Sequence, residues 1–321
     1  MNFHLQFPLQ PFSEKVNYSD KILLIGSCFA EDIGETMKRY KFNTGINPHG
    51  VLYNPASIAV ALRRYCENKK LHRDELFLSN ECWNSWEHHS RFSNKNKEVC
   101  LTEINNSISS AYECIKNTEW LFITFGSAFA YKRNGQLVGN CHKRAQKEFT
   151  KELLTTSEIV KEYKQLIQEL KKINRNLKIV FTISPVRYVR DGIVENNLSK
   201  ARLIDAVHQL VKENENAFYF PAYELVIDDL RDYRFYKSDL VHPNEQAIEY
   251  VFEKLMQTMF SEETKILFGK IKDIITAKEH RVFNSDTEAF RKFKNTYLER
   301  CKGIQKEFPF IGMKNEESYF K

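Results

Sequence analysis

Short, continuous apolar runs alternate with longer amphipathic stretches over the first 260 residues. The apolar runs predict buried strands at residues 21–25, 120–125, 178–183 and 218–220. Apolar positions spaced three and four apart predict helices near residues 29–40, 57–65, 103–116, 157–173, 198–214 and 244–258. Strands that alternate with helices of this length form βαβ units. We therefore expect a three-layer α/β/α sandwich around a central, mostly parallel sheet.

The pattern changes after residue 260. No strand signal returns, and apolar residues recur at helical spacing from Ile266 to Cys301. We expect two parts, an α/β domain over residues 1–260 and a helical C-terminal extension over residues 261–321 that packs on it.

Composition excludes several classes of protein. The 321 residues are 42% hydrophobic and 28% charged, which is typical of a globular chain. The formal charge of +6 is spread along the chain, so no basic arm for nucleic acid is expected. No apolar run is long enough to span a membrane.

The sequence also predicts a compartment and the absence of cofactors. Residues 1–8 lack the features of a signal peptide, and the seven cysteines show no CxxC spacing, so we expect free thiols and a cytoplasmic protein. The chain has neither a Gly-rich nucleotide motif nor a metal-ligand spacing. We expect no cofactor and no metal.

The first candidate catalytic group is Ser27, which follows the strand at residues 21–25 and precedes a helix. A hydroxyl at the carboxyl end of a central strand lies where open α/β sheets bind ligands. The adjacent helix N-terminus offers free N–H groups and a positive dipole end to an oxyanion. The alternative interpretation is that Ser27 only caps the helix.

The second candidate is the pair Asp239 and His242, just before Pro243 and the start of a helix. This spacing allows the carboxylate to meet the imidazole, so that Asp239 orients His242 as a general base. The alternative is a turn aspartate beside a histidine that caps the helix.

Together these motifs resemble the SGNH/GDSL hydrolase superfamily, which has a nucleophile after its first strand and an Asp-x-x-His-Pro block before its last helix. Residues 22–30 (ILLIGSCFA) and 47–55 (NPHGVLYNP) resemble two blocks of the GSCFA family within it. The resemblance covers most of residues 15–255. It implies a flavodoxin-like sandwich in which Ser27 is the nucleophile, His242 the general base and Asp239 the residue that orients it.

The resemblance also implies an oxyanion hole. Gly50 would donate its backbone N–H beside the amide of Ser27. The superfamily usually supplies a side-chain donor from an Asn two residues after a Gly, but Ala128 occupies that position here. Asn140 is our substitute candidate, on the expected return arm of a hairpin that starts at the same strand end. For both Gly50 and Asn140 the alternative is a simple turn residue.

Three further predictions concern the neighbourhood of the site. Cys28 is a rival nucleophile because a thiolate attacks well, although the superfamily role falls on Ser27 and buried free thiols are common. Trp86, His88 and His142 are candidate substrate contacts. The aromatic segment around the first two is alternatively a packed loop.

The leading functional hypothesis is a serine esterase that removes acyl groups, O-acetyl groups on a carbohydrate or another small polyol included. A second hypothesis keeps the triad and transfers the acyl group to a sugar hydroxyl. A third is a catalytically silent ligand-binding protein on the same fold, which the missing Asn at position 128 favours.

Overall fold

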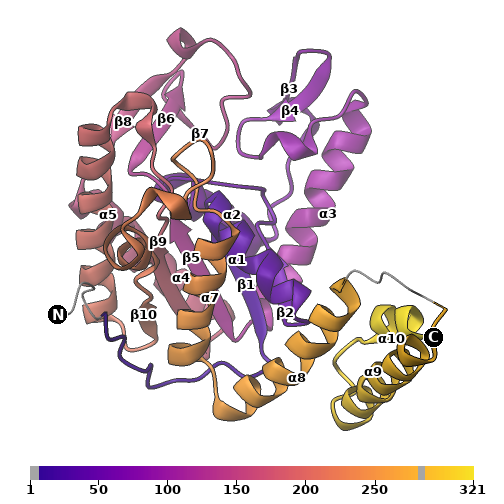
Figure 1. The fold of residues 1–321 in the computed structure, drawn as a ribbon. Helices are drawn as coiled ribbons and strands as arrows, with labels where there is room; N and C mark the ends of the chain where they lie inside the picture. The colour runs from indigo at the N-terminus through magenta and orange to yellow at the C-terminus, as the bar shows by residue number, and fades with distance from the viewer. Residues whose placement is uncertain (1–6, 281–285) are drawn as a thin grey trace.

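Five parallel strands form the central sheet of the computed structural model, which describes residues 7–280 and 286–321 (Figure 1). They are β1 (Lys21–Gly26), β2 (Asn43–Ile46), β5 (Trp120–Phe125), β9 (Lys178–Ile183) and β10 (Ala217–Tyr219), in the order β10-β9-β5-β1-β2. Each neighbouring pair is parallel. The predictions for residues 1–6, including the lack of a signal peptide, lie outside the described residues.

Helices cover both faces of this sheet, which confirms the predicted three-layer sandwich (Figure 1). Alternate residues of each strand point to opposite faces. Ile22 and Leu24 pack with α1 (Cys28–Arg39) and α7 (Glu245–Met259), whereas Leu23 and Ile25 pack on the other face. The helices of that second face are α2 (Pro55–Glu67), α3 (Lys97–Lys116), α4 (Thr156–Ile173) and α5 (Ile193–Glu213).

The strand order places a topological switch point between β1 and β5. The chain leaves β1 for β2 on one side and later adds β5, β9 and β10 on the other. Open α/β sheets bind ligands outside the carboxyl ends of the strands at such a point. We therefore expect a ligand to bind at the turns that follow Gly26 and Phe125.

Two small sheets and several short helical turns lie at the carboxyl edge, which is the edge of the central sheet where its parallel strands end (Figure 1). β3 (Leu76–Ser79) pairs with β4 (Cys82–Ser85), and β6 (Phe129–Arg133) lies between β7 (Gln136–Val138) and β8 (Thr150–Leu153). Short helices are η1 (Arg73–Glu75), η2 (Ser90–Phe92), η3 (Gln146–Glu148), η4 (Val189–Asp191), α6 (Ala222–Glu224), the π-helix η5 (Leu225–Leu230) and η6 (Tyr233–Phe235). β6 and β7 form a hairpin whose return strand ends at Val138, so Asn140 lies two residues beyond the return arm on which it was expected.

The C-terminal region is helical, as predicted. It contains α8 (Glu262–Glu279), α9 (Glu288–Glu307) and α10 (Lys314–Phe320). Ile271 of α8 and Ile304 of α9 belong to the same apolar cluster as Phe29 of α1, so the extension shares the core of one sheet face. The division into domains at residue 260 stays a prediction.

Candidate active site

Ser27 occupies the turn between β1 and α1, at the switch point. Its backbone N–H donates to the carbonyl of Thr124 in β5 at 3.1 Å, and its Oγ is buried. Among the described residues, none accepts or donates a hydrogen bond at that Oγ. The turn fits closely against β5, because a Cβ on Gly26, whose φ is +139°, would lie 2.1 Å from the Thr124 oxygen.

Asp239 and His242 are in contact. Asp239 Oδ2 lies 2.7 Å from His242 Nδ1, while Oδ1 accepts the backbone N–H groups of Val241 and His242 at 2.9 and 3.0 Å. The N–H donors of His242 and Val241, then the imidazole, lower the pKa of Asp239 to about 2. An ionised carboxylate thus holds the proton on Nδ1 and leaves Nε2 as the proton acceptor.

The loop that carries this pair is fastened to the carboxyl edge of the sheet. The N–H of Arg187, beyond the end of β9, donates to Val241 O at 3.3 Å, and within the loop the N–H of Lys237 donates to His242 O at 2.7 Å. Burial raises the pKa of Asp32 on α1, and the charges of Lys237 and His242 on the neighbouring loop partly oppose that rise. The loop lies beside α1, because Lys237, Pro243 and Asn244 line one cavity together with Asp32, and the side chain of His242 is 41% exposed.

Gly50 does not offer a free donor. Its N–H is used in a hydrogen bond to Asn47 O at 2.7 Å, so the predicted oxyanion contact would require this turn to open. The glycine is needed for packing instead, since a Cβ at its φ of +78° would lie 2.2 Å from His89 Cβ. Asn47 ties the same turn to β1 through its Oδ1, which accepts the N–H of Gly26 at 2.8 Å.

Asn140 lines a cavity of about 180 Å³ beyond the end of β5. Its Oδ1 accepts the backbone N–H of His142 at 2.8 Å, which is the contact of a turn residue. Tyr53 and Ser127 line the same cavity and flank Gly126. A Cβ on Gly126 would lie 3.2 Å from Tyr53 Cδ1 and 3.3 Å from Ser27 Cβ, so the cavity adjoins the β1–α1 turn.

Ala128 uses its backbone where an Asn side chain was expected. It is buried, and its N–H donates to Ser199 Oγ at 2.7 Å. The one donor that this residue has is therefore directed at α5 and away from an oxyanion.

The candidate substrate residues Trp86, His88 and His142 form part of a packed wall. Trp86 stacks on Phe77 with ring centroids 3.7 Å apart, and His88 stacks on His49 at 4.0 Å. Burial lowers the pKa of His88 to about 3, and it also lowers the pKa of His142. Both imidazoles are neutral and largely shielded from solvent, which agrees with the packed-loop alternative more than with substrate contact.

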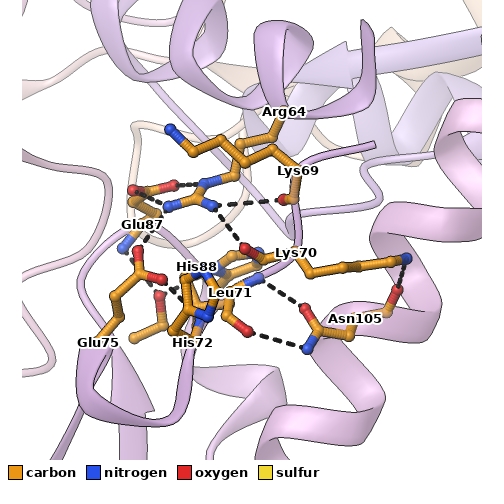
Figure 2. Close-up of polar contacts among 10 residues, drawn as sticks. Arg64, Lys69, Lys70, Leu71, His72, Glu75, Glu87, His88 and Asn105 are labelled. Carbon is orange, nitrogen blue, oxygen red and sulfur yellow. Dashed lines mark hydrogen bonds and ion pairs between the residues drawn. The ribbon is translucent and has the colours of Figure 1, made fainter. Parts of the chain in front are cut away.

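An ion pair fixes this wall to α2. The buried guanidinium of Arg64 contacts Glu87 through Nε and Nη2, the latter at 2.8 Å, and Glu75 through Nη2, also at 2.8 Å (Figure 2). Glu87 lies between Trp86 and His88 in the chain, so the pair holds the whole segment against the domain. Trp86 remains beside a second cavity of about 640 Å³, whose lining includes His49 and Glu75.

Sequence reasoning missed Lys200, a buried cation at the carboxyl edge. This α5 side chain is 1% exposed, and its Nζ donates to Gly126 O at 2.7 Å and to Ser184 O at 2.6 Å. Burial lowers its pKa to about 7, against the opposite effect of nearby Cys28. A lysine in a helix is usually solvated, so no sequence signal distinguishes it.

The described ranges 7–280 and 286–321 contain no cluster of three or more His, Cys, Asp or Glu side chains arranged to hold a metal ion. No helix within these ranges has the length and apolarity needed to cross a membrane.

Comparison with known proteins gives a family and a distant structural neighbour. A model of the GSCFA family matches residues 21–255, and a model described as the GSCFA domain protein, C-terminal domain, matches residues 271–321. No curated protein matches. An acetyl xylan esterase from the rumen bacterium Butyrivibrio proteoclasticus is 11% identical, with a TM-score of 0.39. The match covers 75% of this chain and 64% of that chain.

Proposed function

We propose that this chain, which belongs to the GSCFA family, hydrolyses acyl esters at the carboxyl edge of its parallel sheet. The observation that carries the proposal is the 2.7 Å contact between Asp239 Oδ2 and His242 Nδ1, on a loop that lies beside α1. An imidazole that a carboxylate orients, on a loop beside the helix that follows the first strand, is suited to act as the general base of acyl transfer.

His242 acts as general base and then as general acid. Its Nε2 takes the proton of a nucleophile in the β1–α1 turn, for which the sequence predicts Ser27, and the nucleophile attacks the ester carbonyl. The imidazolium, stabilised by Asp239, returns that proton to the leaving alkoxide. Water, deprotonated by His242, then releases the acid from the acyl-enzyme. The first N–H groups of α1 face the developing oxyanion.

The substrate we propose is a small acyl ester of a polyol or carbohydrate, with O-acetyl groups among the candidates. The cavity of about 180 Å³ beside the turn supports a small substrate group. Its lining combines aromatic rings such as Tyr53 and Phe149 with the guanidinium groups of Arg144 and Arg190. Such a lining suits a polar body with a short apolar substituent.

The test is hydrolysis of p-nitrophenyl acetate and of a peracetylated sugar by wild type, His242→Ala and the control His280→Ala. His280 is exposed at the end of α8, far along the chain from the site. We expect His242→Ala to lower kcat/KM by about 10³-fold or more and the control to match wild type. Equal rates for His242→Ala and wild type would contradict the proposal. Adding a free polyol distinguishes transfer, which yields an acylated polyol, from hydrolysis.

A further inference from the structure

We infer that the nucleophile of this site is the thiol of Cys28, and that Ser27 is a structural residue of the turn. The inference rests on the proposed function, because it names the attacking atom of the same site. Four observations carry it: the enclosure of Ser27, the position of Cys28 on α1, the neighbouring ammonium of Lys200, and the loop beside α1 that holds His242.

Ser27 is enclosed by the sheet. The residue is 1% exposed, and its Oγ has no accessible surface through which an ester could approach. Its N–H, which an oxyanion hole would need, is already used by Thr124 O at 3.1 Å. The backbone of Gly26 and Gly126 packs closely around it, since an added Cβ would lie 2.1 Å from Thr124 O at Gly26 and 3.3 Å from Ser27 Cβ at Gly126.

Cys28 is the first residue of α1 and is partly exposed. Burial raises the pKa of its thiol, and the backbone N–H groups of Phe29 and of Cys28 itself oppose that rise by favouring the thiolate. These are groups that a helix leaves without intrahelical partners at its N-terminus. The same two donors that stabilise a thiolate are therefore available to an oxyanion once the sulfur has been acylated.

Lys200 lies next to the turn that precedes Cys28, since its Nζ donates to Gly126 O, and a Cβ on Gly126 would lie 3.3 Å from Ser27 Cβ. Two of the three N–H groups of its ammonium are used by Gly126 O and Ser184 O, and its charge favours the thiolate of Cys28. Burial dominates and raises the pKa of Cys28 to about 11, with Asp32 adding to the rise. The resting group is thus a thiol, and attack requires a general base.

His242 is placed to be that base. Asp32 lies one helical turn beyond Cys28 on α1, and it interacts electrostatically with both Cys28 and His242. Lys237, Pro243 and Asn244, from the loop that holds His242, line one cavity together with Asp32, so this loop lies beside α1 one helical turn from Cys28. Tyr53, which lines the small cavity, is also within electrostatic range of Cys28.

The chemistry balances with these groups and water alone. His242 Nε2 takes the thiol proton as the sulfur forms a bond to the ester carbonyl carbon. The carbon–oxygen bond to the alcohol breaks, and the imidazolium protonates the departing alkoxide. Water, deprotonated by His242, attacks the resulting thioester, the carbon–sulfur bond breaks, and the thiolate recovers its proton. No oxidant or reductant is needed.

The experiment is to trap and map the acyl-enzyme. Wild type, Cys28→Ala, Cys28→Ser and Ser27→Ala are mixed rapidly with p-nitrophenyl acetate, quenched in acid and analysed by intact mass. Fragmentation of the tryptic peptide of residues 22–38, which holds both candidates, then assigns the acetyl group. Cys66→Ala, which removes another partly buried thiol, is the matched control.

We expect the acetyl group on Cys28 of wild type and of Ser27→Ala, as a thioester that neutral hydroxylamine cleaves. Cys28→Ala should lose hydrolysis by about 10³-fold or more, whereas Ser27→Ala should lose less than about tenfold. Cys28→Ser should carry a hydroxylamine-resistant acetyl ester and turn over more slowly. An acetyl group or a fluorophosphonate label on Ser27 would overturn the inference.

Alkylation separates this inference from the proposed function. We expect iodoacetamide to modify Cys28 faster than Cys66, and His242→Ala to slow only Cys28. If no ester is hydrolysed but His242 still accelerates the alkylation of Cys28, the proposed function is wrong and the activation of Cys28 by His242 is confirmed. If hydrolysis depends on His242 while Cys28→Ala keeps the wild-type rate, the thiol assignment alone fails.

Discussion

At the scale of single residues, Asp239 performs two separable tasks. Its Oδ1 holds two backbone N–H groups and so shapes the loop, and its Oδ2 holds His242 Nδ1. Asp239→Asn can keep the first task with its amide oxygen, but its NH₂ group faces Nδ1 and stabilises the wrong tautomer. We expect kcat/KM to fall by about 10³–10⁴-fold with an unchanged urea midpoint. Loss of activity together with a lower midpoint would show that the loop, not the tautomer, had changed.

Lys200 should make stability depend on pH. Its pKa is about 7 in the folded protein and 10.5 as the ordinary value, so between these values the unfolded chain binds more protons. Below about pH 7 the folded protein buries the charged ammonium at its full desolvation cost. This cost disappears as the pH rises and the lysine folds in its neutral form. Lys200 should therefore increase the free energy of unfolding by at most about 1.4 kcal/mol for each pH unit over that interval.

The measurement is urea unfolding of wild type and Lys200→Met at pH 7.0, 7.75 and 8.5. Cys28 and the ring of Tyr223, 5.8 Å from Nζ, face the same ammonium and remain in both proteins. Stability should rise with pH more steeply in wild type than in Lys200→Met. Parallel curves would mean that Lys200 does not change its charge on folding.

At the scale of elements, the approach of β1 to β5 depends on Gly26. A Cβ there would meet the Thr124 oxygen at 2.1 Å, and the φ of +139° is unfavourable for other residues. We expect Gly26→Ala to cost about 3 kcal/mol or more in unfolding free energy, measured by urea denaturation. Gly269→Ala is the control.

Gly269 lies on the exposed side of α8, with nothing within 4 Å of an added Cβ. Alanine should stabilise the protein there by about 0.5–1 kcal/mol, because helix propensity is the only change. If Gly26→Ala and Gly269→Ala change the unfolding free energy equally, the close packing of β1 against β5 does not require glycine at position 26.

Elements with a strong periodic signal could be predicted, and those set by tertiary contacts could not. β1, β5 and β9 are continuous apolar runs because both faces of the sheet are covered. β2, residues 43–46, contains Asn, Thr and Gly and is a strand only because β1 pairs with it. The helix predicted from residue 103 begins at Lys97, because the Asn96 side chain accepts the N–H groups of Glu98 and Val99.

The candidate site divides in the same way. Asp239 and His242 meet within one loop, so their three-residue spacing predicted the contact. The enclosure of Ser27, the burial of Lys200 and the stacking of His49 on His88 depend on how separate elements pack. For Gly50, a hydrogen bond to Asn47 O occupies the N–H that sequence reasoning left free, whereas Asn140 accepts the N–H of His142 at Oδ1, which is not the donor that an oxyanion would use.

At the scale of the whole molecule, a buried carboxylate connects the C-terminal extension to the α/β domain. Glu316 of α10 is 3% exposed, and its Oε1 accepts from Lys41, which follows α1, at 2.9 Å and from Lys278 of α8 at 3.1 Å. These two lysines hold the pKa of Glu316 low despite the opposing effect of burial. The carboxylate thus joins three segments that are distant in the sequence.

Glu316→Gln keeps the shape of the side chain but removes the charge that two ammonium groups face. Because both lysines can turn toward solvent, we expect a loss of about 1–3 kcal/mol in unfolding free energy, smaller than for a fully buried pair. Hydrogen exchange should rise in α9 and α10 before it rises in β1 and β5, since Glu316 fastens the extension and not the sheet. Esterase activity should persist, because α9 and α10 lie away from the carboxyl edge of the sheet (Figure 1). Uniform exchange across the sheet and the extension would instead show that the whole chain unfolds as one cooperative unit.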